Sequence, residues 1–287
     1  MTESITDAVR EGYGNVARQG LGSRQEGVRS IANAFGYSDE ELGSIPDEAN
    51  MGLSCGNPVA MASLREGETV VDLGAGGGLD VFLASRQVGP AGRAIGIDMT
   101  GDMVSLARAN AKKGNYDNVR FYLAEIEAMP IPSASVDCVI SNCVLNLCED
   151  KDAALAEVFR ILKPGGRLAV SDIALKQPLP VEIEKEVAAW TGCIGGALTI
   201  EDNRNKLVNA GFAQVDIHDS QADLNVYKEA GAAACCGPAP SCCGPGDSAQ
   251  EEPAVDPKFH DEMSKLLDTF DVNEYAASVK MFALKPE

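Results

Sequence analysis

The segment Thr69–Gly78, TVVDLGAGGG, places an apolar run directly before a set of closely spaced glycines. The apolar run predicts a short buried strand. Gly74, Gly76 and Gly78 let the backbone turn tightly and approach a ligand without a Cβ in between. Asp72 lies inside this turn, where its carboxylate would repel a phosphate and attract a positive charge. We therefore expect a nucleotide-type loop for a cationic ligand; the alternative is an ordinary strand-to-helix turn without a ligand.

Polar residues also end the other predicted strands, and in an open α/β sheet ligands bind beyond the carboxyl ends of the strands. Asp98 ends the strand GRAIGID, at the place where a Rossmann-like unit puts an acid on ribose hydroxyls. Ile126 and Glu127 follow the next strand and are expected at the same edge of the sheet. Asn142 ends the fourth strand beside them. Together with the glycine loop, these residues are the expected cofactor-binding set.

Three of the nine cysteines could meet a ligand at the same edge of the sheet. Cys55 precedes the first strand, Cys143 follows the fourth, and Cys193 lies in the segment after the fifth. A single unpaired cysteine is more often a small buried hydrophobic residue. The two histidines, His218 and His260, come late in the chain, away from these strand ends. We find no conventional base there for an oxygen or nitrogen acceptor, whereas an intrinsically nucleophilic acceptor needs none.

The glycine-loop segment resembles motif I of the class I S-adenosylmethionine-dependent methyltransferases, and this resemblance extends from Thr69 to Ala174. Around the three cysteines, SCGN, SNCVLNL and TGCIGGAL together resemble the arsenite methyltransferases. The segments GIDMT and DVNEYAASVKMFALKP strengthen the match, which covers most of the chain outside residues 230–257. A more N-terminal cysteine of some members has no counterpart, because no cysteine precedes Cys55. The disulfide relay attributed to those members is therefore not predicted here.

The resemblance implies S-adenosylmethionine as the methyl donor and trivalent arsenic as the acceptor. Cys55, Cys143 and Cys193 would be both the catalytic residues and the arsenite ligands, because trivalent arsenic is thiophilic and keeps a nucleophilic lone pair when three thiolates hold it. Tyr13 would close over the cofactor, Met99 would pack on adenine, and Ile126 with Glu127 would face the adenine end. Each methylation oxidises arsenic, so an external thiol reductant, thioredoxin or glutathione, is implied. Arsenite and methylated arsenicals are the expected partners, in arsenic detoxification.

The predicted strands and helices alternate, which is typical of an α/β protein with a Rossmann-like class I methyltransferase sheet: mostly parallel, with an antiparallel last strand and helices on both faces. Helices are expected at 2–18, broken near Gly12 and Gly14, and at 24–35, 101–112 and 151–161. The loop-rich stretch 37–58 is expected to form a lid. Two helical stretches should flank TGCIGGALT, and another helix should cover FHDEMSKLLDTFDV before the last strand.

One domain with additions is expected rather than two domains. Residues 1–66 would form the N-terminal helices and the lid with Cys55. Residues 67–222 would form the methyltransferase core, including the arsenic-binding segment around Cys193. A flexible insertion rich in Cys, Gly and Pro is expected at 223–258, where it would interrupt the fold, and residues 259–287 would supply the C-terminal helix and the final strand.

The insertion carries the run CCGPAPSCC, with Cys235, Cys236, Cys242 and Cys243. A zinc-like site is disfavoured, because adjacent cysteines lack the CxxC turn that folds two sulfurs onto one metal. A bland disordered tail with incidental thiols remains open. The other hypothesis is a flexible arm that captures arsenite and delivers it to the three-cysteine site.

The composition restricts the partners and the compartment. Lys and Arg number 24 against 43 Asp and Glu, for a net charge of -19, so a nucleic-acid partner is not expected. The chain has no apolar run of about 18 residues and no apolar N-terminal core of the signal-peptide kind. A cytoplasmic monomer with reduced thiols and no membrane partner is therefore expected. Cys138 and Cys148 should pack in the core.

Two other functions stay open. A small-molecule C-methyltransferase of the quinone or sterol type shares the fold and the LKPGG segment, but it leaves the three cysteines unexplained. A cysteine-based metalloid-binding protein would explain the cysteines, but it gives no role to the intact Asp72, Asp98 and glycines.

Overall fold

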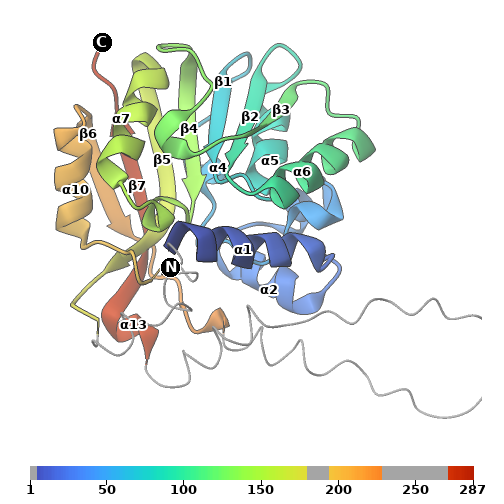
Figure 1. The fold of residues 1–287 in the computed structure, drawn as a ribbon, viewed down its shortest axis with the longest axis horizontal. Helices are drawn as coiled ribbons and strands as arrows, with labels where there is room; N and C mark the ends of the chain where they lie inside the picture. Colours follow the sequence, from blue (N-terminus) through green and yellow to red (C-terminus); the bar gives the residue numbers. More distant parts are fainter. Residues whose placement is uncertain (1–4, 180–193, 228–270) are drawn as a thin grey trace, which may run out of the picture.

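A computed structural model describes residues 5–179, 194–227 and 271–287. Within these residues lies a seven-stranded sheet in the order β3-β2-β1-β4-β5-β7-β6 (Figure 1). The strands are β1 (Thr69–Leu73), β2 (Arg93–Asp98), β3 (Val119–Leu123), β4 (Val136–Asn142), β5 (Leu162–Leu175), β6 (Ala213–Asp219) and β7 (Ala276–Leu284). β5 includes the KPGG segment at its start.

Strands β1 to β5 pair in parallel, whereas β7 runs antiparallel to both of its neighbours, β5 and β6. This confirms the predicted α/β sheet, mostly parallel with an antiparallel last strand. Parallel strands need crossover connections, which bring the carboxyl ends of successive strands to the same edge. The strand order changes direction at β1, which lies between β2 and β4. An open α/β sheet binds its ligands at such a point.

Helices cover both faces of the sheet (Figure 1). α4 (Pro58–Met61), α5 (Leu79–Val88) and α6 (Gly101–Lys113) pack on one face, and α7 (Lys151–Ile161) and α10 (Ile200–Asn209) pack on the other. Side-chain caps explain where two of them begin. The Asp150 carboxylate accepts the Ala153 N–H at 2.9 Å, and the Thr199 hydroxyl accepts the Asp202 N–H at 3.0 Å. Shorter elements are η2 (Ile126–Ala128), η3 (Leu145–Leu147) and α13 (Val272–Tyr275).

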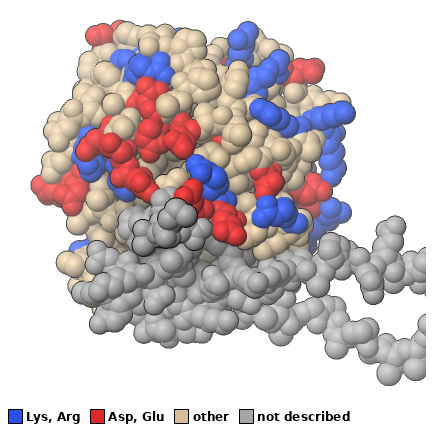
Figure 2. Space-filling model, viewed as in Figure 1, with Lys and Arg blue, Asp and Glu red and all other residues tan. Residues whose placement is uncertain are grey.

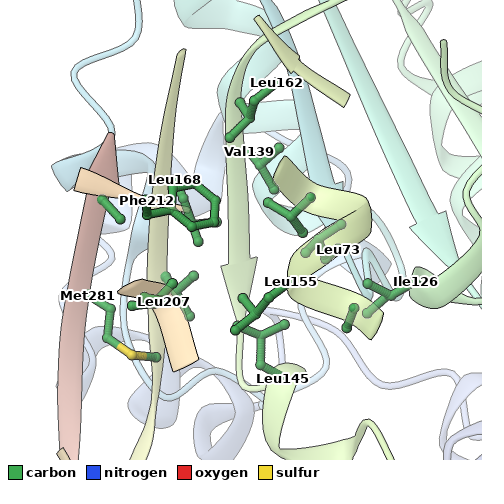
Figure 3. Close-up of a cluster of buried hydrophobic side chains, with 14 of the residues drawn as sticks. Leu73, Ile126, Val139, Leu145, Leu155, Leu162, Leu168, Leu207, Phe212 and Met281 are labelled. Atoms are coloured by element: carbon green, nitrogen blue, oxygen red, sulfur yellow. The ribbon is translucent and has the colours of Figure 1, made fainter. Parts of the chain in front are cut away.

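The core on the α7 and α10 face holds the strands against these helices (Figure 3). Leu73 of β1 and Val139 of β4 belong to one buried cluster with Leu155 of α7, and the same cluster continues to Leu168 of β5 and Phe212. Most residues of β1 and β4 are buried, because strands in the middle of a parallel sheet are covered on both faces. This packing fixes the positions of the strand ends at which the functional residues lie.

The N-terminal segment contributes α1 (Ile5–Arg18), α2 (Glu26–Ala34), α3 (Asp39–Gly43) and η1 (Asp47–Ala49). The predicted break near Gly12 and Gly14 is wrong, because α1 continues through both glycines. Gly14 lies against α6: a Cβ at this position would be 3.2 Å from Asp102 Oδ2 and 3.7 Å from the Thr100 methyl group. Close packing on α6 therefore compensates for the low helix propensity of glycine.

The stretch 37–58, predicted as a loop-rich lid, is well packed. A capping box starts α3: Ser38 Oγ accepts the Glu41 N–H at 3.2 Å, and the Glu41 carboxylate accepts the Ser38 N–H at 2.8 Å. Asn50, Ser54 and Asn57 are all buried. Buried polar residues need internal hydrogen-bond partners, which gives this stretch a defined conformation against the end of the sheet.

β6 and β7 are neighbours in the sheet, and a long connection, residues 220–275, joins them along the chain. Its first part stays packed, with Leu224 only 2% exposed. Residues 228–270, which include the four cysteines of the predicted insertion and most of the predicted helix at 259–272, lie outside the described residues. Residues 180–193, with Trp190 and Cys193, lie outside them as well.

Charged side chains are unevenly distributed over the surface. Figure 2 shows basic side chains gathered over α6, and acidic ones nearer the centre and left of the same face, alongside α7. Within the part of the chain that the structure describes, no helix has the length and apolar character required to cross a bilayer.

Candidate functional site

A cavity of about 550 Å³ lies at the ends of β1, β2 and β4, beside α1. Most of the predicted cofactor residues line it: Tyr13, Asp72, Gly74, Gly76, Asp98, Met99, Ile126, Glu127 and Asn142. Gly78 is not among the lining residues. It caps α5 with φ 99°, and a Cβ there would lie 2.6 Å from the Phe82 ring. Packing therefore explains this glycine better than contact with a ligand does.

The glycine loop is held between two strand ends. Gly74 and Gly76 have φ values of 64° and 50°, in the left-handed region that favours glycine. A Cβ at Gly74 would overlap the side chain of Val144, which follows β4. The Gly76 N–H donates to Asp98 Oδ2 at 2.9 Å. The loop backbone therefore lies along the cavity wall with little room for larger residues.

Asp98 ends β2 and accepts two backbone hydrogen bonds, from Gly76 N at 2.9 Å and from Thr100 N at 2.8 Å. Burial raises the pKa of this carboxyl more than these hydrogen bonds lower it. A carboxylate has about four acceptor positions, so Asp98 can also accept hydrogen bonds from hydroxyl groups in the cavity. Its position therefore fits the ribose role that the sequence predicts.

Asp80, in the first turn of α5, is a cavity residue that sequence reasoning missed. It is buried and accepts hydrogen bonds from the Tyr37 hydroxyl at 2.7 Å and from Asn142 Nδ2 at 3.2 Å. The available signal was an acid in the first turn of the helix that follows the glycine loop. Burial raises the pKa of Asp80 to about 6.

Asp72 lies near Asp80 at the same end of the cavity. Burial, followed by the charges of Asp80 and Asp98, raises its pKa well above the usual range. Each of these causes disfavours the ionised form of Asp72. A positively charged ligand would relieve this repulsion, which is consistent with the cationic ligand that the sequence predicts.

Helix α1 forms one side of the cavity. Thr6 Oγ1 donates to Glu149 Oε1 at 2.7 Å, and Arg10 pairs with Glu125 at 3.2 Å. Glu149 lies in the segment after β4 and Glu125 in the segment after β3, so these contacts join α1 to two strand ends. Tyr13 on this helix lines the cavity. Its predicted place over a bound cofactor is therefore compatible with the fold.

Methionine side chains supply much of the apolar lining. Met99, which was predicted to pack on adenine, lines the cavity, and Met51 and Met103, which sequence reasoning did not select, line it as well. Met103 lies in the first turn of α6, shortly after Met99 in the chain. Met51 comes from the stretch before β1. Flexible, polarizable thioethers suit contact with a flat aromatic ring. No sequence signal links Met51 to this place, because only the folded chain brings it there.

Cys55 and Cys143 meet, and the structure joins them in a disulfide with Cα atoms 5.8 Å apart. The expectation of reduced thiols is therefore wrong for this pair in the structure. The reason is geometric: two cysteines close enough to ligate one atom are also close enough to bond to each other. Cys143 lines the cavity, whereas Cys55 belongs to a buried cluster with Ile173 and Ile194. Two-electron reduction of the bond would give two adjacent thiols at the edge of the cavity.

The backbone around Cys55 is held by three different partners. Its N–H donates to Asn142 Oδ1 at 3.0 Å, and its carbonyl accepts the Ser278 hydroxyl at 2.6 Å. The Tyr227 hydroxyl lies 3.7 Å from the Cys55 sulfur and donates to the carbonyl of Ser54 at 2.5 Å. Asn142, predicted as a cofactor residue, therefore also contacts the cysteine site.

Asp172 of β5 holds the turn that carries Cys143 through hydrogen bonds from Asn146. Asn146 Nδ2 donates to Asp172 Oδ1 at 2.9 Å and to the carbonyl of Ile173 at 2.7 Å. Lys151 Nζ donates to the carbonyl of Cys148 at 3.0 Å. Burial raises the pKa of Asp172 to about 7. Sequence reasoning missed this network because its members are distant in the chain.

The remaining cysteines divide into two groups. Cys138 and Cys148 are free and buried, as predicted, and burial raises the pKa of each thiol to about 12. Cys193 and the four cysteines of the predicted insertion lie outside the described residues, although Ile194, next to Cys193, is buried in the cluster that holds Cys55 and Cys143. Within the described ranges, no three His, Cys, Asp or Glu side chains form a metal site.

Comparison with known proteins gives matches over most of the chain. The methyltransferase domain family matches residues 64–231. An arsenite methyltransferase from Halobacterium salinarum is 40% identical over 230 residues, which are 75% of this chain and 59% of that protein. The chain thus spans less than two thirds of this relative. A ubiquinone/menaquinone biosynthesis C-methyltransferase from Hahella chejuensis is 31% identical over 177 residues, 61% of this chain and 70% of that protein.

A solved structure supports the same conclusion about the fold. The arsenic(III) S-adenosylmethionine methyltransferase from Chlamydomonas reinhardtii aligns with a TM-score of 0.57 and 25% identity, covering 89% of this chain and 73% of that one. One fold accounts for the sequence match, the strand order and the position of the cavity at the strand ends. The chain belongs to the methyltransferase domain family and has the class I methyltransferase fold.

Proposed function

We propose that this protein transfers methyl groups from S-adenosylmethionine to trivalent arsenic bound by the thiolates of Cys55, Cys143 and Cys193. One observation carries the proposal. Cys143 lies in the wall of the cavity whose glycine loop and carboxylates fit the cofactor, and Cys55 lies directly beside it. A thiophilic acceptor held there would be next to the methyl donor.

The cofactor end of the cavity suits S-adenosylmethionine, which supplies an electrophilic methyl group on a positively charged sulfur. Asp72 and Asp80 would hold its amino group. Both acids are buried in surroundings that disfavour the ionised carboxylate, and a positively charged amino group beside them would stabilise that form. Asp98 would accept hydrogen bonds from the ribose hydroxyls. Met99 and Ile126 would pack against adenine, with Tyr13 over the cofactor.

The cysteine end suits trivalent arsenic as the substrate. Thiolates are its preferred ligands, and arsenic bound by three of them retains a lone pair, so the reaction needs no general base. The buried cluster around Cys55 and Cys143 excludes water from the site. Ile194 belongs to this cluster, and one peptide unit joins it to Cys193, which supports the third ligand. The contribution of the protein would be proximity and orientation, worth several powers of ten in rate.

The redox balance requires a reductant. Transfer of a methyl cation to the arsenic lone pair forms an As–C bond, breaks an S–C bond and leaves arsenic formally pentavalent. Two electrons must return before the next cycle, and Cys55 with Cys143 can supply them by closing the disulfide that the structure contains. Thioredoxin or glutathione would then reduce it. Such a cycle fits arsenic detoxification in a reducing cytoplasm, by a monomer without nucleic-acid or membrane partners.

The four cysteines of the run CCGPAPSCC receive a separate role. We propose that Cys235, Cys236, Cys242 and Cys243 capture arsenite and raise its local concentration, because a tethered ligand group acts at high effective concentration. They would take no part in the methyl transfer itself.

The experiment that tests the function uses purified, reduced protein with arsenite, labelled S-adenosylmethionine and a thiol, followed by chromatography of the arsenic species. Cys143→Ser and Cys193→Ser should lose methylation while still binding the cofactor, because a hydroxyl is too hard a ligand for trivalent arsenic. Cys55→Ser should fail at least at the second methylation. The matched control is Cys138→Ala, a buried cysteine of β4 that lines no part of the cavity.

Two outcomes would decide against the proposal. If any of the three serine variants methylated inorganic arsenite with full activity, the three-thiolate site would be ruled out. Methylation of a quinone or sterol, with none of arsenite, would favour the C-methyltransferase alternative.

A further inference from the structure

Asn142 connects the cavity to Cys55 through a single side-chain amide. Its Oδ1 accepts a hydrogen bond from the Cys55 N–H at 3.0 Å. Its Nδ2 lies 2.8 Å from the carbonyl oxygen of Gly56 and 2.8 Å from the Tyr37 hydroxyl. The same nitrogen lies 3.2 Å from Oδ2 of Asp80. Side chains and backbone from three other segments therefore meet at the end of β4.

The backbone partners determine which way this amide faces. The N–H of Cys55 can only donate, and the carbonyl of Gly56 can only accept. Turning the Asn142 amide over would place two donors against each other and two oxygens against each other, so the orientation follows from the network itself. The Oδ1 end of this rigid planar group thus holds the Cys55 N–H, while the Nδ2 end touches both the Gly56 carbonyl and Asp80 in the cavity.

The surroundings of Asp80 make its ionisation sensitive to a charged ligand in the cavity. Asp72 lies on β1 beside it, and Glu41 of α3 raises the pKa of Asp80 after the larger effect of burial. The hydrogen bonds from Tyr37 and Asn142 lower it. No lysine or arginine is among the causes of the shift. A positive group in the cavity would therefore favour ionised Asp80, and an N–H donates more strongly to a carboxylate than to a carboxylic acid.

We propose that Asn142 is the positioning residue that couples the cofactor cavity to the cysteine site, so that a ligand with an ammonium group in the cavity and trivalent arsenic at Cys55 bind with positive cooperativity. The inference rests on the proposed function. The ammonium group orders Asp80, Asp80 orders the Asn142 amide, and the amide holds Cys55 in its binding position. Cys55 does not line the cavity, so the amide transmits the effect in place of direct contact. By linkage, arsenic must tighten cofactor binding by the same factor.

The first test measures this factor by calorimetry with reduced protein and S-adenosylhomocysteine, which keeps the amino-acid end of the cofactor but has no methyl group to transfer. In the wild type, saturating arsenite should tighten S-adenosylhomocysteine binding by about 5- to 20-fold. Asn142→Ser should bring the ratio of the two affinities to about one, and Asp80→Asn should reduce it in the same direction. Tyr37→Phe, which deletes one hydroxyl of the network, gives a milder variant should Asn142→Ser fail to fold.

Asp98→Asn is the matched control. Asp98 lines the same cavity, but its hydrogen-bond partners are Gly76 and Thr100, outside the Asn142 network. This variant should weaken S-adenosylhomocysteine binding with and without arsenite and leave the ratio as in the wild type. A ratio of one in the wild type, with both ligands bound, would overturn the coupling. So would a ratio that Asn142→Ser and Tyr37→Phe leave unchanged.

A second readout omits arsenic. The rate of Cys55 alkylation by iodoacetamide, followed by mass spectrometry of its peptide, should fall several-fold when S-adenosylhomocysteine binds to the reduced wild type, and it should not change in Asn142→Ser. Cys143, which lines the cavity, should be shielded in both proteins and reports that the ligand is bound. If arsenite fails to bind, the proposed function is wrong, and the alkylation rates decide on the coupling by themselves: equal Cys55 rates with and without S-adenosylhomocysteine would reject it.

Discussion

The backbone N–H of Cys143 donates to the carbonyl oxygen of Ser171 at 2.8 Å, and this bond holds Cys143 at φ 57°, in the left-handed region that residues with a Cβ rarely adopt. Such a conformation costs about 1–3 kcal/mol and persists where its surroundings determine it. Here the Ser171 carbonyl lies on β5, the strand next to β4. The conformation directs Cys143 back toward Cys55, with which it pairs.

The first prediction concerns Asp98→Ala. Loss of the carboxylate should weaken binding of S-adenosylmethionine by roughly 1.5 to 3 kcal/mol, because the ribose hydroxyls lose a charged acceptor. The two N–H groups of Gly76 and Thr100 also lose their partner. Calorimetry measures the change, and Asp117→Ala, at an exposed position away from the cavity, is the control. An unchanged dissociation constant would remove Asp98 from the cofactor site.

The second prediction concerns Gly74→Ala. The added methyl group would overlap Val144, and the positive φ of Gly74 disfavours alanine, so the free energy of unfolding should fall by about 2–4 kcal/mol. The double variant with Val144→Ala should recover part of this loss, which urea titration measures. Gly101→Ala is the control, because its Cβ would meet no atom within 4 Å. Additive effects of the two substitutions would show that the loop does not pack as described.

The third prediction concerns pH and Asp172, whose pKa burial raises to about 7. A raised folded-state pKa means that the folded protein binds more protons than the unfolded chain between about pH 4 and 7. The contribution of Asp172 to the free energy of unfolding therefore falls as the pH rises through this window, by up to about 4 kcal/mol. Asp172→Asn should show a shallower fall from pH 5 to pH 7.5 in urea titrations than the wild type. Parallel curves for the two proteins would contradict it, and Asp117→Asn should follow the wild type.

The fourth prediction concerns the cysteine-rich run outside the described residues. Deletion of residues 233–247 should leave the maximal rate of arsenite methylation nearly unchanged and should lower the rate only at low arsenite, because a capture arm raises local concentration without joining the chemistry. Rates are measured across the arsenite range for both proteins. Identical curves at every concentration would leave this segment without a capture role.

The sequence by itself determined the order of the elements and most of the cavity lining. The apolar run, the glycines and Asp72 lie within ten consecutive positions, and Asp98 follows at the end of the next strand. Signals of this kind are local: the period of the apolar residues predicts strand or helix, and a polar residue at a strand end predicts a place at one edge of the sheet. The parallel sheet and the positions of these residues along the cavity follow from such patterns.

The tertiary structure decided which distant residues meet. Asp80 and Tyr37 share a hydrogen bond across 43 positions in the chain, and Asn142 reaches Cys55 across 87. No local pattern reports such contacts, because they depend on how α5, β4 and the stretch before β1 pack together. The same holds for the continuity of α1 through its glycines and for the pairing of Cys55 with Cys143. Close packing against α6 decided the first, and the left-handed turn at the end of β4 decided the second.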